Sequence, residues 1–263
     1  MRITQNADLS WDFTNRHVVV VGGATGIGAQ VAVDLAAAGA TVDLFDRKEP
    51  DSGRGGRFTQ VDVRDPFGLK DAVRAITADR GPIDSLVYAV GVLDGYARLD
   101  ESTDDLTNTV LDINVLGALR AIRAVVPGMK QHGFGRIVVF GSIAGQVAGA
   151  GGLPYTISKH ALTGLVKHVA VELGPFGITV NAIAPGSISG TNIRTSITEV
   201  LATSVPSNQG LGTMNPQDVA RSYPVGRLGS VDAVVPTLAL LLGRESWFIT
   251  GSTSVIDGGY LAQ

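Results

Sequence analysis

The length and composition of the chain fit one large α/β domain. Its 263 residues are 44% hydrophobic and 17% charged, with 34 glycines and no cysteine. The missing cysteine excludes a disulfide scaffold, a Cys-ligated zinc site and a thiol nucleophile. The formal net charge of −3 argues against a nucleic-acid or anionic-membrane surface. Every apolar run is far shorter than the ~18–20 residues of a membrane span, and the N-terminus lacks a signal-peptide core, so we expect a cytoplasmic protein.

Short β-branched runs alternate with longer stretches of helical period along the whole chain. The expected strands cover 17–21, 41–45, 58–61, 85–89, 137–140, 178–183 and 253–256. The expected helices cover roughly 27–38, 66–79, 103–131, 154–174 and 231–243. Because the strand segments are apolar on both faces, they predict a parallel sheet covered on each side by helices. The pattern therefore predicts a single doubly wound, Rossmann-type parallel sheet of about seven strands.

Two segments depart from this alternation. Residues 187–224 are rich in Ser, Thr, Gly, Asn and Pro and carry short amphipathic pieces, which favours a helical lid over a pocket, with a disordered loop as the alternative. Residues 47–61 have no helical period, so the crossover helix expected there is missing or reduced. We expect 1–10 to be an N-terminal tail and 11–263 to form one domain.

A glycine-rich turn follows the first strand directly. Gly22, Gly26 and Gly28 stand between four consecutive valines and an expected helix. Glycines at this spacing permit a tight turn and close approach of the backbone to a pyrophosphate, which the N–H groups of the helix N-terminus then bind. The residues of this turn predicted to bind a dinucleotide are Gly22, Thr25, Gly26, Ile27 and Gly28.

Acidic residues end the second and third expected strands. Asp46 lies 18 residues beyond the last glycine, where a carboxylate binds the adenosine ribose hydroxyls and repels a 2′-phosphate. The sequence therefore predicts NAD in preference to NADP, although Arg47 could pair with that phosphate if it turned inward. Asp62 and Val63 are predicted to meet the adenine edge.

Four polar side chains are predicted to carry chemistry. Tyr155 and Lys159 are spaced i, i+4, so they share one face of a helix. A neighbouring ammonium and a cationic nicotinamide favour the phenolate, which makes Tyr155 the expected general acid and base. Ser142 follows the fifth strand and could hydrogen-bond a substrate oxygen. Asn114 lies on the apolar face of its helix, where we expect it to hold a water in a proton path, with a purely structural hydrogen bond as the alternative.

These motifs together resemble the short-chain dehydrogenase/reductase family over about residues 11 to 260. Besides the residues above, the likeness rests on Asn181–Gly186 and on the closing Val255–Gly259. The resemblance implies a Rossmann-type oxidoreductase with the catalytic set Asn114, Ser142, Tyr155 and Lys159. It further implies cofactor contacts from Ala89, Gly91, Asn114, Tyr155, Lys159, Pro185, Gly186 and Ile188. It implies no metal, and it implies a homotetramer, with a dimer as the alternative.

Three positions depart from the family pattern. Val21 stands where the family has Thr before the first glycine, so one hydrogen bond that braces the turn is lost. Tyr88-Ala89-Val90-Gly91 replaces Asn-Asn-Ala-Gly, so only backbone contacts are expected from 89–91. The Thr expected after Pro-Gly corresponds to either Ser189 or Thr191. None of these departures touches the four catalytic positions.

The expected pocket segments, 92–96, 142–152 and the lid, are apolar or small and polar, with few charges. They predict a neutral, fairly hydrophobic secondary alcohol or its ketone as substrate, because a carboxylate or phosphate would call for a bidentate Arg. The resemblance leaves a dihydrodiol dehydrogenase and a 3-oxoacyl thioester reductase as alternatives. A non-catalytic NAD-sensing protein and a dehalogenase on the same fold are alternatives of another class.

Overall fold

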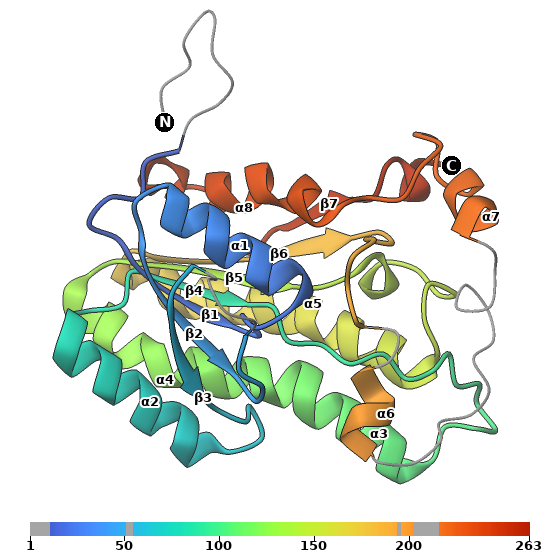
Figure 1. Ribbon diagram of the computed structural model, residues 1–263, viewed down its shortest axis with the longest axis horizontal. Helices are drawn as coiled ribbons and strands as arrows, with labels where there is room; N and C mark the ends of the chain where they lie inside the picture. The colour runs from blue at the N-terminus through green and yellow to red at the C-terminus, as the bar shows by residue number, and fades with distance from the viewer. Residues whose placement is uncertain (1–10, 51–54, 194–195, 202–215) are drawn as a thin grey trace, which may run out of the picture.

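A seven-stranded, wholly parallel sheet forms the centre of the protein. The computed structural model describes residues 11–50, 55–193, 196–201 and 216–263 (Figure 1). The strand order is β3-β2-β1-β4-β5-β6-β7. The strands are β1 His17–Val21, β2 Thr41–Asp46, β3 Arg57–Gln60, β4 Ser85–Tyr88, β5 Gly135–Phe140, β6 Ile178–Pro185 and β7 Thr253–Ile256. This order confirms the predicted doubly wound fold. From β1 the chain adds β2 and β3 on one side, and it then adds β4 to β7 on the other side of β1.

Helices cover both faces of the sheet. One face carries α1 and α8, and the other carries α2, α4 and α5 (Figure 1). The α-helices are α1 Gly26–Ala37, α2 Pro66–Arg80, α3 Asp104–Leu111, α4 Gly117–His132, α5 Leu153–Leu173, α6 Ser196–Leu201, α7 Pro216–Arg221 and α8 Val235–Leu242. The short 3₁₀ turns are η2 Ile143–Gly145, η3 Gly174–Phe176, η5 Val231–Val234, η6 Arg244–Ser246 and η7 Tyr260–Ala262.

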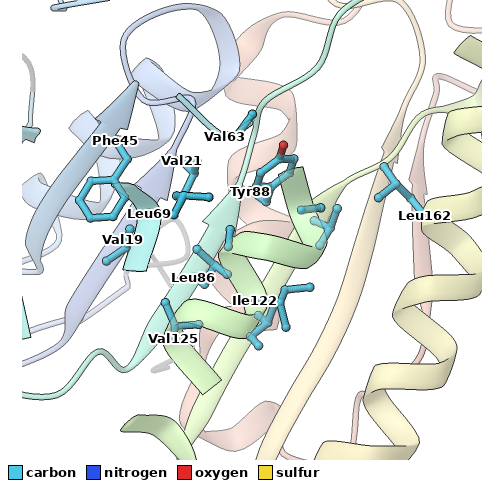
Figure 2. Close-up of a cluster of buried hydrophobic side chains, with 14 of the residues drawn as sticks. Val19, Val21, Phe45, Val63, Leu69, Leu86, Tyr88, Ile122, Val125 and Leu162 are labelled. Atoms are coloured by element: carbon cyan, nitrogen blue, oxygen red, sulfur yellow. The ribbon is translucent and has the colours of Figure 1, made fainter. Parts of the chain in front are cut away.

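The alternation of side chains along each strand divides the core into two layers. In β1, Val19 and Val21 enter the cluster beneath α2, α4 and α5, whereas Val18 and Val20 enter the cluster beneath α1 and α8. Figure 2 shows the first of these clusters, with Leu86 and Tyr88 of β4 beside side chains of the covering helices. Two-sided burial is the physical reason that the strands are apolar at consecutive positions.

The expected helix at 103–131 is interrupted by one π-helical turn, Asp112–Leu116 (η1), which separates α3 from α4. Such a turn inserts one extra residue into a helix and leaves backbone groups to be satisfied from outside. The hydroxyl of Tyr88 supplies one donor, to the carbonyl oxygen of Ile113 at 2.6 Å. Asn114 therefore lies within an irregular turn that the sequence pattern did not predict.

No helix occurs among the described residues between β2 and β3. The chain instead passes close to its neighbours, since a Cβ on Gly56 would lie 2.5 Å from the carbonyl oxygen of Val42. The predicted tail, residues 1–10, lies outside the described residues, as do 194–195 and 202–215 of the predicted lid. In the described part of the lid, 196–201 and 216–221 are helical, as α6 and α7.

Among the described helices, none has both the length and the apolar character needed to cross a membrane.

Candidate active site

A cavity of about 490 Å³ opens at the carboxyl ends of the strands. In a doubly wound sheet, the reversal of strand order leaves a crevice at this edge. Gly28 and Asn114 do not line the cavity, whereas all the other predicted cofactor and catalytic residues do. The lining residues from the prediction are Gly22, Thr25, Gly26, Ile27, Asp46, Asp62, Val63, Ala89, Gly91, Ser142, Tyr155, Lys159, Pro185, Gly186 and Ile188.

The glycine turn needs its glycines for two physical reasons. Gly22 and Gly26 have φ of 84° and 55°, in the left-handed region that side-chain-bearing residues rarely adopt. Gly28 faces the turn itself, and a Cβ there would overlap the carbonyl oxygen of Gly22. The turn therefore brings α1 against the end of β1 and leaves the first N–H groups of α1 beside the cavity. This arrangement fits a pyrophosphate.

Asp46 braces the turn that lacks the family's threonine. Its carboxylate accepts hydrogen bonds from the N–H of Ala24 at 3.0 Å and the N–H of Lys48 at 3.2 Å. Gly22 N–H also donates to the carbonyl oxygen of Phe45 at 2.7 Å. The end of β2 thus holds the turn in place from the side, and the Asp46 carboxylate is fixed at the end of the cavity where the sequence predicts the adenosine.

Basic side chains accompany the acids at that end. Arg47, Lys48 and Arg64 line the cavity together with Asp46 and Asp62. Arg64 donates to both oxygens of Asp62, with its terminal nitrogen 2.7 Å from Oδ2. This hydrogen bonding lowers the pKa of Asp62 against the opposing effect of burial. The sequence interpretation included Arg47 but missed Arg64, which lies two residues beyond Asp62 and is brought to the cavity by that pairing.

Ser142, Tyr155 and Lys159 converge on the deeper part of the cavity. Tyr155 and Lys159 are 5% and 3% exposed, and the Lys159 ammonium lies 5.4 Å from the centre of the Tyr155 ring. Lys159 donates to the carbonyl oxygen of Phe140 at 2.9 Å. A Cβ on Gly91 would lie 3.5 Å from the Lys159 nitrogen, so the chain at Gly91 runs beside the ammonium.

Burial sets the electrostatics of this group. Burial raises the pKa of the Tyr155 phenol, and the charges of Tyr96 and Asp94 raise it further. Hydrogen bonding from Ser142 acts in the opposite direction and lowers this pKa. Burial also lowers the pKa of Lys159 to about 8. The sequence led us to expect a pKa lowered by the ammonium together with a bound cationic nicotinamide. Without the nicotinamide, burial has the largest effect and raises this pKa, and the lowering by bound cofactor stays a prediction.

Asn114 lies behind the cavity wall. Its side-chain oxygen accepts from the N–H of Val92 at 2.8 Å, and its amide donates to Val92 O and to Ser158 Oγ, each at 3.0 Å. Ser158 in turn donates to the carbonyl oxygen of Tyr155 at 2.7 Å. Both amide hydrogens are used in these structural bonds, so the side chain ties the loop after β4 to α5. Its predicted hold on a water stays a prediction.

The segment after β6 runs along the cavity, and both Ser189 and Thr191 line it. The Ser189 hydroxyl donates to the carbonyl oxygen of Gly229 at 3.0 Å, and the Thr191 hydroxyl donates to the carbonyl oxygen of Ile188 at 3.3 Å. Thr191 also lies over the start of α1, where a Cβ on Gly26 would be 3.5 Å from its methyl group. This position favours Thr191 for the phosphate contact, which stays a prediction. Ser187 N–H donates to the Tyr223 hydroxyl at 2.8 Å, which fixes the course of this segment.

The remaining wall of the cavity is mainly apolar. It includes side chains from the loop after β4, the loop after β5 and the lid: Val92, Leu93, Tyr96, Ile143, Ala150, Ile193 and Val200. Ser196 joins the lid to the first of these loops by accepting from Leu93 N–H at 3.2 Å. The sequence interpretation named these segments but missed Leu228, which reaches the cavity from beyond the lid.

Asp94 does not belong to the cavity wall. It is a charged residue of the expected pocket segment 92–96, yet it is fully buried, with an exposure of 0%. Within the described residues, no cluster of three or more His, Asp or Glu side chains could hold a metal ion.

Comparisons with known proteins agree with this geometry. The family model described as Enoyl-(Acyl carrier protein) reductase matches residues 22–261. The chain is 36% identical to Oxidoreductase UcpA of Escherichia coli, over 94% of each protein. It is 33% identical to acetoacetyl-CoA reductase of Shinella zoogloeoides, over 93% of this chain and 98% of that protein. Among solved structures, gluconate 5-dehydrogenase from Burkholderia cenocepacia in complex with NADP and tartrate has a TM-score of 0.82 and 26% identity. That match covers 96% of this chain and 97% of the other.

Proposed function

Because the chain belongs to the short-chain dehydrogenase/reductase family, we propose that it transfers a hydride between NAD(H) and a neutral, fairly hydrophobic secondary alcohol or its ketone. The oxidoreductase class follows from the family, whereas the cofactor preference, the substrate class and the residue roles are the proposal. The observation that carries it is the convergence of Ser142, Tyr155 and Lys159 on a mainly apolar cavity that begins at the glycine turn.

The proposed roles follow from the positions of the side chains. When bound, the nicotinamide supplies the hydride acceptor for oxidation or the donor for reduction. Tyr155 takes the hydroxyl proton as the hydride leaves the carbinol carbon, and it returns that proton to the oxygen in reduction. Ser142 donates a hydrogen bond to the substrate oxygen, and Lys159 holds positive charge 5.4 Å from the Tyr155 ring. Burial raises the pKa of Tyr155 in the protein without cofactor, which favours the phenol, the form that donates a proton in reduction. Oxidation uses the phenolate, which the Lys159 ammonium and a bound cationic nicotinamide favour.

The preference for NAD rests on Asp46, whose carboxylate is held at the adenosine end of the cavity by two backbone N–H groups. A fixed negative charge there repels a 2′-phosphate. The relevant competitor is NADP, because the basic side chains of Arg47 and Lys48 line the same end of the cavity and could bind a 2′-phosphate. In addition, gluconate 5-dehydrogenase, which is similar in structure, was solved with NADP. The ratio of kcat/KM for the two cofactors tests this part of the proposal.

A second candidate is the reduction of a 3-oxoacyl thioester. The similarity to acetoacetyl-CoA reductase favours it. Arg47, Lys48 and Arg64 line the predicted adenosine end of the cavity, but these basic side chains are compatible with both candidates.

We also propose that residues 11–263 act as one cytoplasmic dehydrogenase unit with a lid at 187–224, and that the protein assembles as a homotetramer. Light scattering of the purified protein tests the assembly.

The test of the activity is NAD⁺ reduction, followed by NADH absorbance, across aryl carbinols, amino alcohols, cyclic diols, polyols and 3-hydroxyacyl thioesters. Tyr155→Phe is assayed beside the parent. Turnover of neutral secondary alcohols by the parent, lowered by about 10²–10⁴-fold in the variant with NADH affinity retained, supports the proposal. Turnover confined to thioesters selects the second candidate. No turnover of any class, with NADH bound equally by both proteins, would identify a sensor and overturn both.

A further inference from the structure

Asp94 is a fully buried carboxylate on the loop between β4 and α3. Three backbone N–H groups donate to it: Tyr96 at 3.0 Å and Gly152 at 3.1 Å, both to Oδ1, and Tyr155 at 2.8 Å to Oδ2. A carboxylate taken out of water needs such donors, because burial otherwise disfavours its charge. These N–H groups come from two segments that lie about sixty residues apart in the sequence.

One of the two segments is the first turn of α5. The N-terminal N–H groups of a helix need acceptors from outside the helix, and the residue at the N-cap, Gly152, provides no side chain for this. Asp94 takes the place of that cap from another loop. Its negative charge also lies at the positive end of the helix dipole, which stabilises the turn. Since Tyr155 is in this turn, the position of its backbone depends directly on Asp94.

The other segment is the turn at Gly95 and Tyr96. Both residues lie in the left-handed region, with φ of 70° and 62°. For a large aromatic residue such as Tyr96 this conformation is strained, and it persists only where the surroundings impose it. The hydrogen bond from Tyr96 N–H to Asp94 imposes it here. A second bond, from Leu153 N–H to the carbonyl oxygen of Ala97 at 2.9 Å, fastens the end of the same turn to α5.

The strained turn delivers the Tyr96 side chain to the cavity. Tyr96 lines the cavity and lies in an apolar cluster that also contains Tyr155. The remaining members of that cluster are Leu93, Ala144, Ala150 and Ile193. Tyr96 therefore lies on the substrate side of Tyr155, at a distance from the glycine turn, and its ring forms part of the surface that a substrate would meet.

We propose that Asp94 is a positioning residue that joins the substrate subsite to the catalytic tyrosine, and that the strained Tyr96 it holds is a substrate-contacting, specificity-determining residue. One carboxylate thus fixes two tyrosines relative to each other, so that the wall of the subsite and the acid–base group cannot shift independently. The inference rests on the proposed function for its catalytic meaning, whereas the shared anchoring rests on the hydrogen bonds alone.

The charged and titratable groups around Tyr155 predict a second consequence. Lys159 faces its ring, Ser142 hydrogen-bonds its phenol, and the charges of Tyr96 and Asp94 raise its pKa. Removal of the Asp94 charge makes the Tyr155 phenolate more favourable. The limb of the pH–rate profile that reports ionisation of Tyr155 then moves to lower pH, which a purely structural role for Asp94 would not cause.

The first experiment compares Asp94→Asn with Asp100→Asn, which removes an exposed acid from the same loop (side chain 78% exposed). Asparagine offers one acceptor oxygen in place of two, and its NH₂ group then faces a backbone N–H that also donates, so one hydrogen bond is lost. We expect kcat/KM for the alcohol to fall by roughly tenfold to a hundredfold in Asp94→Asn. NADH affinity stays unchanged and the pH limb moves to lower pH, while Asp100→Asn behaves as the parent. An unmoved pH limb would overturn the electrostatic part.

Amide hydrogen exchange tests the anchoring without any turnover. In Asp94→Asn we expect faster exchange in both 95–97 and 152–158, but not in Asp100→Asn. Faster exchange in only one of the two segments would overturn the shared anchor, even if the proposed reaction is correct. Gly152→Ala is the second variant, because its Cβ would lie 2.5 Å from both Asp94 Oδ2 and the backbone nitrogen of Ala97, so it displaces the carboxylate without removing its charge. It should loosen the same two segments and move the pH limb less than Asp94→Asn does.

The role of Tyr96 is tested with Tyr96→Gly and Tyr96→Phe. Glycine accepts the left-handed conformation without strain, so Tyr96→Gly should keep the thermal stability of the parent. It should raise KM for the preferred alcohol about tenfold or more through lost ring contact, with kcat changed less. Tyr96→Phe should retain the parent KM for hydrophobic substrates. Equal KM values in the parent and Tyr96→Gly would overturn the specificity role while leaving the proposed reaction intact.

Discussion

The two ends of the parallel sheet both bury charged side chains, but they use them differently. At the amino end, Asp43 is fully buried and receives His17 Nε2 at 2.8 Å and Arg57 Nε at 3.0 Å. Arg136 at the same end donates to the backbone carbonyl oxygens of Gly135, Gly177, Gly243 and Arg244. At the carboxyl end, Lys159 donates one hydrogen bond within the described part of the chain, to Phe140 O, so two of its three N–H donors remain for groups in the cavity.

Burial of a charge therefore does not locate function by itself. At the amino end, the buried charges make several hydrogen bonds within the protein, and this part of the sheet stabilises the fold. Desolvation still lowers the pKa of Arg136 there to about 10. At the carboxyl end, the buried polar groups face a cavity of about 490 Å³, and desolvation lowers the pKa of Lys159 to about 8. Substitutions at the two ends should consequently separate stability from turnover.

The largest effect is expected at Asp43. Asp43→Ala leaves the partners His17 and Arg57 without their buried acceptor, and breaking such a pair lowers the free energy of unfolding by about 3–5 kcal/mol. Turnover at 25 °C should be unchanged in the folded fraction.

Burial raises the pKa of Asp43, but hydrogen bonding from His17 and the charges of Arg80 and Arg57 outweigh it and lower the pKa overall. The parent should therefore lose stability as the solution is acidified below pH ~4, and the variant should lose less; urea unfolding at several pH values measures both.

Lys159→Met should show the opposite pattern. We expect turnover to fall about 10²–10³-fold, because a preorganised positive charge is lost from the reacting group. Melting temperature at neutral pH should not fall, because methionine removes an ammonium that is costly to bury. A fall in stability comparable to that of Asp43→Ala, with turnover retained, would contradict the distinction between the two ends.

The same variant tests the pKa of Lys159. The pKa of Lys159 is about 8 in the folded protein and near 10.4 in the unfolded chain. The unfolded state therefore keeps this proton up to a higher pH than the folded state does. The parent should gain stability from about pH 8 toward pH 10, since stability rises with pH wherever the unfolded state binds more protons. Lys159→Met should lack this gain, which urea unfolding across the same pH range measures.

Tyr88→Phe should have a smaller effect. The change removes the hydroxyl donor to the carbonyl oxygen of Ile113, and loss of one buried hydrogen bond lowers stability by about 0.5–1.5 kcal/mol. Because Ile113 lies in the π turn that holds Asn114, turnover should fall as well, with NADH affinity unchanged. Thermal unfolding and steady-state kinetics measure these effects. Tyr260→Phe, at a partly buried tyrosine away from the cavity, is the matched control and should change neither quantity.

The smallest effect is expected from Asp46→Asn. Asparagine keeps an acceptor for Ala24 N–H but removes the negative charge, so the preference for NAD over NADP should fall by roughly tenfold. The ratio of kcat/KM for the two cofactors measures the change. Arg47→Gln should move the ratio in the other direction if that side chain meets the 2′-phosphate. An unchanged ratio in Asp46→Asn would show that the carboxylate acts only as a brace for the turn.

Elements defined by local patterns were predicted well from the sequence. All seven strands and the main helices lie within a few residues of their predicted bounds, since apolar periodicity and glycine punctuation are local signals. The residues of the glycine turn and the Tyr155–Lys159 pair were also found, because spacing alone puts them on one turn or one helix face. The π turn at Asp112–Leu116 was missed, as no side-chain pattern distinguishes it from a continuous α-helix.

Local sequence patterns were enough to predict the sheet and the residues that reach its carboxyl edge, because the apolar period of each strand and the glycine turn are local signals. The electrostatics of those residues follow from the tertiary structure. The raised pKa of Tyr155, the complete burial of Asp94 and the position of Thr191 over the start of α1 depend on desolvation and on contacts between segments far apart in the chain. Those quantities are set by what surrounds a residue in space, and its neighbours in the sequence do not specify them.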